Sequence, residues 1–168
     1  MANDKLNRPT KERMAILRNQ ASYLLWNGRI ETTVAKAKSL QSYVEKLLTK
    51  AINSYEDVVK VEKKIKENGK EVTKEFMNDG AKKLAARRLI MAKLYDIQET
   101  KLPKESKTAY SARISDVRHP LIEKIFNVYA PKYAERAKEL GQGGGYTRVI
   151  KTGARRGDAA ELAIIELV

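Results

Sequence analysis

The sequence predicts an α+β fold, a two-layer sandwich of several helices packed on a small mixed sheet, with a charged helical insertion. Three observations support this prediction. Segments with apolar residues at helical spacing fill most of the first 140 residues, a short strand-like run interrupts them near residue 30, and two further strand-like runs close the chain. Because this order lacks the regular alternation of a doubly wound sheet, helices and strands are expected to form separate layers.

Composition defines the size of the core and the class of partner. The chain has 168 residues, of which 42% are hydrophobic. This is enough for one core, and we expect a single domain over residues 1–168. Lysine and arginine number 34 against 21 acidic residues, which gives a net charge of +13. Such a chain attracts polyanions through its long-range field and through counterion release, so nucleic acid is the leading partner class.

Several other classes are disfavoured. No segment approaches the roughly 18 consecutive apolar residues of a membrane span, and the N-terminus has no apolar signal-peptide core, so we expect a cytoplasmic protein without a membrane partner. The chain has no cysteine and a single histidine, His119, which argues against a metal site or cofactor. The glycine run at residues 141–148 lacks the lysine and hydroxyl residue of a nucleotide-binding loop, and no nucleophile elbow occurs. We therefore expect no catalytic residues and no small-molecule substrate.

Two helices and a short strand are predicted in the first third of the chain. Thr10 is placed to cap a helix that ends near residue 26, where Gly28 provides the usual stop. Arg29–Thr33 has the β-branched content of a strand, and one of its two threonines caps a second helix. The apolar stripe of that helix is the most regular in the chain and consists of Val34, Ala37, Leu40, Val44, Leu47, Leu48 and Ala51.

Two insertions are expected on either side of a central helix. Residues 55–80 are rich in lysine, glutamate and valine, with one turn signal at Asn68-Gly69, and indicate a charged helical insertion or a hairpin. Ala81–Tyr95 has the spacing of a strong helix. Residues 97–117 form the second insertion, and the segment 100–113 within it is predicted to be a loop because it has few large apolar residues.

The last third predicts a helix, a glycine-rich joint and a β-hairpin. His119-Pro120 begins the helix, because proline costs little in a first turn, and Pro131 interrupts it. Gly141–Gly145 forms the joint. The strands Tyr146–Thr152 and Ala160–Val168 follow, joined by a loop whose glycines permit positive backbone angles. The final strand has apolar residues on both faces, which favours a position inside the sheet with helices on at least one side.

Cationic side chains gather on the predicted C-terminal hairpin. Arg148 and Lys151 belong to its first strand, while Arg155 and Arg156 occupy the tip of its loop. A guanidinium group pairs well with phosphate oxygens. Tyr146 shares a face with Arg148 in an extended strand, and it either stacks on a base or packs in the core. We therefore predict that this hairpin binds RNA.

A second set of cationic residues lies on the first two helices and the segment before them. The candidate RNA contacts there are Arg8, Lys11, Arg13, Arg18, Lys36 and Lys38. Lys36 and Lys38 point to different faces of a helix, so only one of them is expected to meet a phosphate. Helix surfaces normally carry lysine and arginine, and an ordinary solvated surface is the alternative for this set.

Several blocks of the sequence resemble the bacterial large-subunit ribosomal protein L17 family. In chain order, the blocks that carry the resemblance are Arg8–Thr10, Leu17–Asn19, Gly28–Thr33, Ala35–Lys38, Ala86–Leu89, Pro131–Arg136, Gly144–Lys151, Arg155–Asp158 and Ile164–Val168. Together they cover most of the chain outside residues 55–80 and 97–117. The last three of these blocks are similar to the C-terminal signature of the family.

The resemblance implies a structural ribosomal protein, not an enzyme, that binds large-subunit (23S-type) rRNA in the cytoplasm. It also implies a position near the exit of the peptide tunnel, contacts with neighbouring ribosomal proteins and a two-layer fold of helices on a small sheet. RNA recognition is expected to depend on shape and phosphate positions more than on base edges. The alternative is a basic protein-interaction adaptor, or a transient RNA binder, in which residues 55–80 dock another protein.

Overall fold

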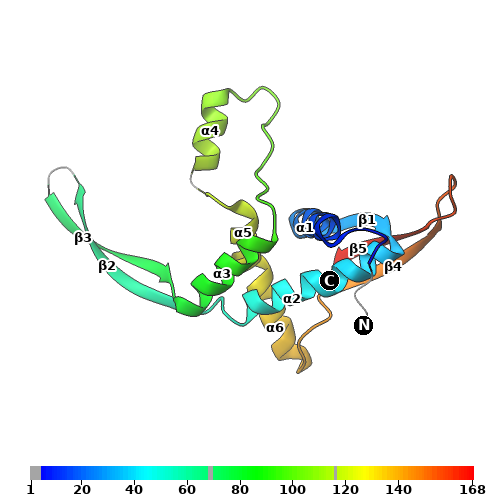
Figure 1. Cartoon of the computed structure of the whole chain (residues 1–168). Helices are drawn as coiled ribbons and strands as arrows, with labels where there is room; N and C mark the ends of the chain where they lie inside the picture. Colours follow the sequence, from blue (N-terminus) through cyan, green and yellow to red (C-terminus); the bar gives the residue numbers. More distant parts are fainter. Residues whose placement is uncertain (1–4, 68–69, 116) are drawn as a thin grey trace.

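The chain folds into a layer of helices on a three-stranded sheet, from which two extensions project (Figure 1). The computed structural model describes residues 5–67, 70–115 and 117–168. Its elements in chain order are α1 (Thr10–Asn27), β1 (Arg29–Thr33), α2 (Val34–Ile52), β2 (Val58–Glu67), β3 (Lys70–Asp79), α3 (Ala81–Lys93), α4 (Lys107–Ser115), α5 (Pro120–Lys124), the π-helical turn η1 (Ile125–Tyr129), α6 (Ala130–Leu140), β4 (Thr147–Ala154) and β5 (Glu161–Leu167).

The sheet has the strand order β1-β5-β4, and both of its strand pairs are antiparallel. The central position predicted for the last strand is confirmed. Ala163 and Ile165 of β5 are fully buried, while Ile164 on the opposite face is partly exposed. The expected mixed sheet is wrong in detail. A short loop joins β4 to β5 and forces these strands to run in opposite directions, and β1 also runs against β5.

Helix α2 lies at the centre of the core. Its predicted stripe is confirmed, since all seven apolar residues are buried, and the helix packs on the sheet and on α1, α3, η1 and α6. Gln41, the polar residue that interrupts the stripe, donates a hydrogen bond from Nε2 to the Thr147 carbonyl at 3.2 Å. Thr147 in turn donates from Oγ1 to Glu45 at 3.0 Å. The polar positions of α2 therefore fix the first residue of β4.

The first helix begins at Thr10, as expected, but without the predicted threonine cap. Pro9 is the residue before the helix, and its backbone is extended, with φ −54° and ψ 151°. Thr10 therefore lies in the first helical turn, where its side chain cannot cap the helix. At the other end Gly28 adopts a left-handed φ of 79° and donates its N–H to the Leu24 carbonyl at 2.8 Å, as predicted.

The helix that begins at Pro120 continues through Pro131 to Leu140. The predicted interruption takes the form of a π-helical turn, η1, in which the Ala130 N–H donates to the Ile125 carbonyl. Proline has no N–H, and its ring crowds the preceding turn of a helix. The wider π-helical turn accommodates that ring, so the helical path changes locally but does not end.

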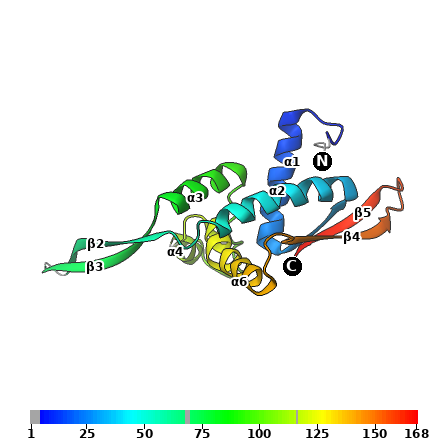
Figure 2. The ribbon, with the colours of Figure 1, turned by 90° about the horizontal axis from the view of Figure 1, so that it is seen from below.

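Residues 58–67 and 70–79 form a two-stranded antiparallel ribbon, so the helical interpretation of the insertion is wrong and the hairpin alternative is correct. Pairing runs from Val58 with Asp79 to Glu67 with Lys70. Val59 and Val61 share one face of the ribbon with Phe76, and this alternation of β-branched and aromatic residues favours strands. The predicted Asn68-Gly69 turn lies outside the described residues. The ribbon projects at the opposite end of the molecule from the β4–β5 hairpin (Figure 2).

Part of the second insertion is helical. The predicted loop over 100–113 is wrong from Lys107 onward, where α4 begins. The Arg113 side chain explains this local order, because it pairs with Glu99 and Glu105 and donates to the Thr100 carbonyl at 3.3 Å. No residue of α4 is buried. Ion pairs within the segment, which hydropathy patterning does not detect, thus hold a helix without a core.

The base of the ribbon is tied to the helical layer by polar contacts. Asp79 forms ion pairs with Lys83 at 3.1 Å and with Arg87 at 2.6 Å, and Arg87 also pairs with Glu123 of α5. Burial alone would raise the pKa of Asp79, but the hydrogen bonds from Lys83 and Arg87 outweigh it and lower that pKa. Arg87, from a block that resembles the family, therefore has a structural role.

Asp57 caps the N-terminus of helix α3, although the whole ribbon separates the two in the sequence. Its Oδ2 accepts hydrogen bonds from the backbone N–H groups of Lys82 at 2.8 Å and Lys83 at 3.3 Å. Gly80, the residue before the helix, leaves room for this carboxylate, because a Cβ there would lie 2.3 Å from Asp57 Oδ1. The pair Asp57 and Gly80 thus forms one capping unit at the junction between ribbon and helix.

Replacing Asp57 with alanine should lower the free energy of unfolding by about 0.5–2 kcal/mol, the usual cost of a lost N-terminal cap. Gly80→Ala should cost a similar amount, because the new methyl group displaces the carboxylate. Both substitutions disrupt the same hydrogen bonds, so the double variant should unfold at nearly the same denaturant concentration as Asp57→Ala. Glu56→Ala, at an exposed neighbour, is the control. Additive losses in the double variant would contradict a shared cap.

Candidate nucleic-acid interface

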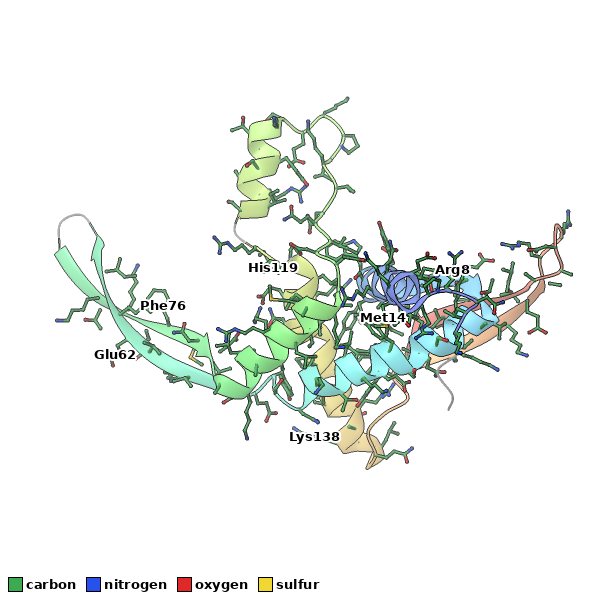
Figure 3. The ribbon with its side chains drawn as sticks, in the orientation of Figure 1. Arg8, Met14, Glu62, Phe76, His119 and Lys138 are labelled. Carbon is green, nitrogen blue, oxygen red and sulfur yellow. The ribbon has the colours of Figure 1, made fainter. Side chains whose placement is uncertain are left out.

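The two sets of predicted RNA contacts lie at the same end of the molecule. The first set belongs to α1, the segment before it and the start of α2, and the second belongs to β4 and the loop after it. The pairing of β1 with β5 and the packing of α2 on β4 bring the two sets together. Figure 3 shows Arg8 at this end, far from Glu62 and Phe76 on the β2–β3 ribbon. We call this end the cationic end.

Three cations of the β4–β5 hairpin have acidic partners. Arg148 pairs with Glu166 at 2.5 Å, and Lys151 lies 3.9 Å from Glu161. Arg155 binds Asp158 through two hydrogen bonds, of 2.9 and 2.6 Å. The side chains of all three cations are more than half exposed. Exposed ion pairs contribute little in water, so a phosphate group can compete with these carboxylates.

Arg156 differs from its neighbour at the loop tip. It is exposed, and within the described part of the chain no carboxylate pairs with it. Arg155 instead helps to order the tip, since its carbonyl accepts from the Ala159 N–H and its N–H donates to the Ala160 carbonyl, both at 2.9 Å. Arg156 is therefore the hairpin cation most available to a phosphate, and Arg155 is partly structural.

The Arg155–Asp158 pair controls a carboxyl pKa. The hydrogen bonds from the Arg155 guanidinium, helped by one from the Ala160 N–H, lower the pKa of Asp158 to about 2. Because the pKa is lowered on folding, the pair stabilises the loop above the ordinary aspartate range and is lost as pH falls through about 2. The tip therefore keeps its shape across the physiological pH range.

The cations of α1 and α2 are less often paired. Arg8 pairs with Glu12 at 3.1 Å, whereas among the described residues Lys11, Lys36 and Lys38 have no ion-pair partner. Lys11 and Lys38 are exposed and Lys36 is half-buried. Most of this set is therefore available to a polyanion.

Two arginines of α1 are partly enclosed. Arg13 and Arg18 are both half-buried. Arg18 lies beside Tyr43, and its Nε is buried without a hydrogen-bond partner in the described structure. Burial raises the pKa of Tyr43, and Arg18 acts in the opposite direction. Arg18 therefore packs against the body of the protein and is less accessible than Lys11.

Tyr146 lies in the core, so its proposed role as a stacking platform is wrong. Only 4% of the residue is exposed, and its ring lies 5.0 Å from the ring of Tyr133. Burial raises the pKa of Tyr133 to about 12. The predicted alternation with Arg148 fails because β4 begins at Thr147, and both Tyr146 and Thr147 are buried. The core alternative for Tyr146 is correct.

Arg29 is a member of this surface that the sequence analysis missed. Helices cover one face of the sheet (Figure 2), and Arg29 is exposed on β1 in register with Glu166 of β5. Arg148 is in register with the same glutamate on the other side. Glu166 therefore lies between two arginines on the open face. The alternation of charged and apolar residues from Arg29 to Glu31 was the signal available in the sequence.

Other types of site have no counterpart in the part of the chain that the structure covers. Among those residues no group of three or more histidine, cysteine, aspartate or glutamate side chains could hold a metal ion. None of the described helices is both long and apolar enough to cross a bilayer. Clustered cations are the main chemical feature of the described surface.

Replacing Arg155 with alanine should raise the pKa of Asp158 from about 2 towards 3.8, because the largest cause of the lowering is removed. The chemical shift of the Asp158 carboxyl carbon, followed by NMR during an acid titration, measures this pKa directly. Arg156→Ala is the matched control and should leave the pKa near 2. An unchanged pKa in Arg155→Ala would refute the role assigned to this pair.

Comparisons with known proteins identify the family of this chain. A family model described as ribosomal protein L17 matches residues 16–168. The chain is 36% identical to the large ribosomal subunit protein bL17 of Lachnospira eligens, over 98% of this chain and 97% of that protein. It is 34% identical to the protein of the same name from Fervidobacterium nodosum, over 100% and 96%, and 38% identical to that from Ruminiclostridium cellulolyticum, over 98% and 97%. The chain belongs to the ribosomal protein L17 family.

Proposed function

We propose that this chain binds 23S-type rRNA in the bacterial large ribosomal subunit through its cationic end. The family consists of structural components of the ribosome, so the chain is not an enzyme and acts in the cytoplasm. The contacts with RNA are assigned to the side chains that share positive charge and access to solvent at the cationic end. These are Arg8, Lys11, Arg13, Arg29, Lys36, Lys38, Arg148, Lys151, Arg155 and Arg156.

The observation that carries this proposal is the uneven distribution of charge. Residues 5–38 and 147–167, which make up the cationic end, contain twelve cationic and five acidic side chains, whereas the ribbon from Val58 to Asp79 contains six and five. Phosphate binding depends on excess positive charge, because each neutralised phosphate releases counterions. The cationic end therefore suits RNA far better than the nearly neutral ribbon does.

The β4–β5 hairpin contributes to RNA binding through the fixed positions of its cationic groups more than through net charge. Three of its four cations are held by Glu166, Glu161 and Asp158, and an incoming phosphate replaces or joins these carboxylates. Guanidinium groups fixed in this way lose little conformational entropy when they bind. Unpaired lysines on the helices supply attraction, and oriented arginines on the hairpin set the register of the RNA.

We further propose that residues 1–168 act as one rRNA-binding domain near the exit of the peptide tunnel. One connected core supports the single domain, since buried residues from α1, α2, α3, α5, η1, α6 and β5 belong to the same cluster. The two insertions, at residues 55–80 and 97–117, project from this core (Figure 1). The position near the tunnel exit rests on the family resemblance alone.

Loss of Arg156 should weaken rRNA binding more than loss of Arg155, because Arg156 has no competing carboxylate in the described structure. Filter binding to large-subunit rRNA at several salt concentrations tests this. Removing one phosphate contact should reduce the slope of log affinity against log salt by roughly 0.7–0.9. Lys64→Ala on the ribbon is the control and should leave the slope unchanged. Equal slopes for Arg156→Ala and the wild-type protein would exclude that side chain from the interface.

A second function, docking of a neighbouring ribosomal protein, is favoured by the ribbon. Its apolar face carries Val59, Val61, Ile65 and Phe76, and half of the Val59 residue is exposed. Two-stranded ribbons without a packed face are marginally stable in water, so this face gains from a partner. Its balanced charge suits protein better than RNA. This role is compatible with rRNA binding elsewhere on the same chain.

Shortening the ribbon should leave rRNA binding intact. Deleting residues 60–77 and joining Val59 to Asn78 through Asn-Gly keeps a natural register pair at the new turn. We expect both the shortened and the complete chain to sediment with the large subunit in moderately high salt, where loosely held basic proteins dissociate. Loss of the shortened chain alone would assign retention to the ribbon. Dissociation of both chains from the large subunit would contradict the proposal that this chain is an integral ribosomal protein.

A further inference from the structure

We propose that an open groove across α1 receives one unstacked nucleotide of the rRNA, with its base on the ring of Tyr95. This inference rests on the proposed rRNA binding and adds a specific contact to it. Tyr95 follows α3 in the chain and was not among the predicted RNA contacts. The groove lies between Tyr95 and the first turn of α2, and α1 forms its floor.

The groove has the size and lining of a small polar site. Its volume is about 530 Å³, and it is lined by Ala15, Ile16, Asn19, Gln20, Lys36 and Tyr95. Sites that hold small molecules span roughly 300–1,000 Å³, so a single nucleotide fits. No carboxylate lines the groove. An aromatic ring, two amides and a cation without any acid form a lining that suits a base and its phosphate.

Tyr95 is fixed in place yet open to solvent. Its backbone N–H donates to Ser22 Oγ at 2.8 Å, and that hydroxyl donates to the Arg18 carbonyl at 2.8 Å. Ser22 is only 1% exposed, so this link anchors residue 95 to the interior side of α1. The Tyr95 residue remains 45% exposed. An exposed ring on an anchored backbone suits base stacking, because little backbone freedom is lost on binding.

Gln20 contributes an ordered amide side chain to the lining of the same groove. Its Nε2 donates to Thr32 Oγ1 at 2.9 Å, which fixes the plane of the amide. Its Oε1 is buried and has no hydrogen-bond partner among the described residues. A buried polar atom without a partner is unfavourable, and this amide would have to turn outwards for a base edge to pair with its oxygen. Asn19, which is exposed, adds a second amide that can turn to meet the base.

Lys36 completes the site with a positive charge. It is half-buried and, in the described structure, has no ion-pair partner, so its ammonium group can hold the phosphate of the bound nucleotide. This separates the roles of Lys36 and Lys38, because only Lys36 lines the groove. A peptide without an acidic side chain would leave this lysine unpaired, whereas a nucleotide uses the ring, the amides and the charge together.

The test compares three tyrosine variants of the full chain in binding to large-subunit rRNA. Tyr95→Ala should weaken binding by roughly 5- to 150-fold, which is the loss expected for one stacked base. Tyr95→Phe should bind within about twofold of the wild-type protein, because stacking is kept. Tyr23→Ala is the matched control, since Tyr23 is 50% exposed on α1 but does not line the groove. Circular dichroism establishes that the variants are folded.

The salt dependence separates this contact from the phosphate contacts. Tyr95→Ala should lower the affinity without changing the salt slope, whereas Lys36→Ala should reduce that slope by roughly 0.7–0.9. Equal affinities of Tyr95→Ala and wild type would overturn the nucleotide site and leave the proposed function intact. A wild-type chain that fails to bind rRNA would overturn both. Loss of affinity in Tyr23→Ala equal to that in Tyr95→Ala would also overturn the assignment to the groove.

Discussion

The antiparallel pairing of β1 with β5 is the constraint on which the candidate interface depends. Arg29–Thr33 pairs with Leu162–Glu166, so the first and last parts of the chain form neighbouring strands. This ladder, together with the packing of α2 on β4, fixes the cations of α1 and α2 relative to those of the β4–β5 hairpin. Such non-local pairing carries a large entropic cost, which the burial of α2 against the sheet offsets. The interface is therefore a product of the whole fold.

Arginine has two distinct roles in this molecule, and burial distinguishes them. The Arg87 side chain is 18% exposed, pairs with Asp79 and Glu123, and lies 5.3 Å from the ring centre of Phe126. It fastens the ribbon to α3 and α5, and its burial keeps it from an incoming phosphate. The Arg155 side chain is 53% exposed and is held by a single aspartate. The same ion-pair chemistry is structural at Arg87 and exchangeable at Arg155.

Much of the fold followed from local patterns, and the misses share a physical cause. The stripe of α2 and the two-sided apolar pattern of β5 were read correctly because burial imposes their periodicity. The ribbon was assigned to a helix because its abundant lysine and glutamate are common in helices, and α4 was missed because ion pairs of Arg113 hold it. A hydropathy pattern does not reveal such ion pairs. The face on which Tyr146 lies depends on the residue at which β4 begins. A local sequence pattern defines the start of a strand only to within a residue or two.

The most direct test of the central claim is chemical acetylation of lysines in the free chain and in the assembled large subunit. Binding of rRNA at the cationic end predicts that Lys11, Lys36 and Lys151 lose reactivity on assembly and regain it after digestion of the rRNA. Lys60 and Lys64 of the ribbon should not respond to the digestion. The reverse pattern, with RNA-dependent protection on the ribbon and reactive lysines at the cationic end, would contradict the account.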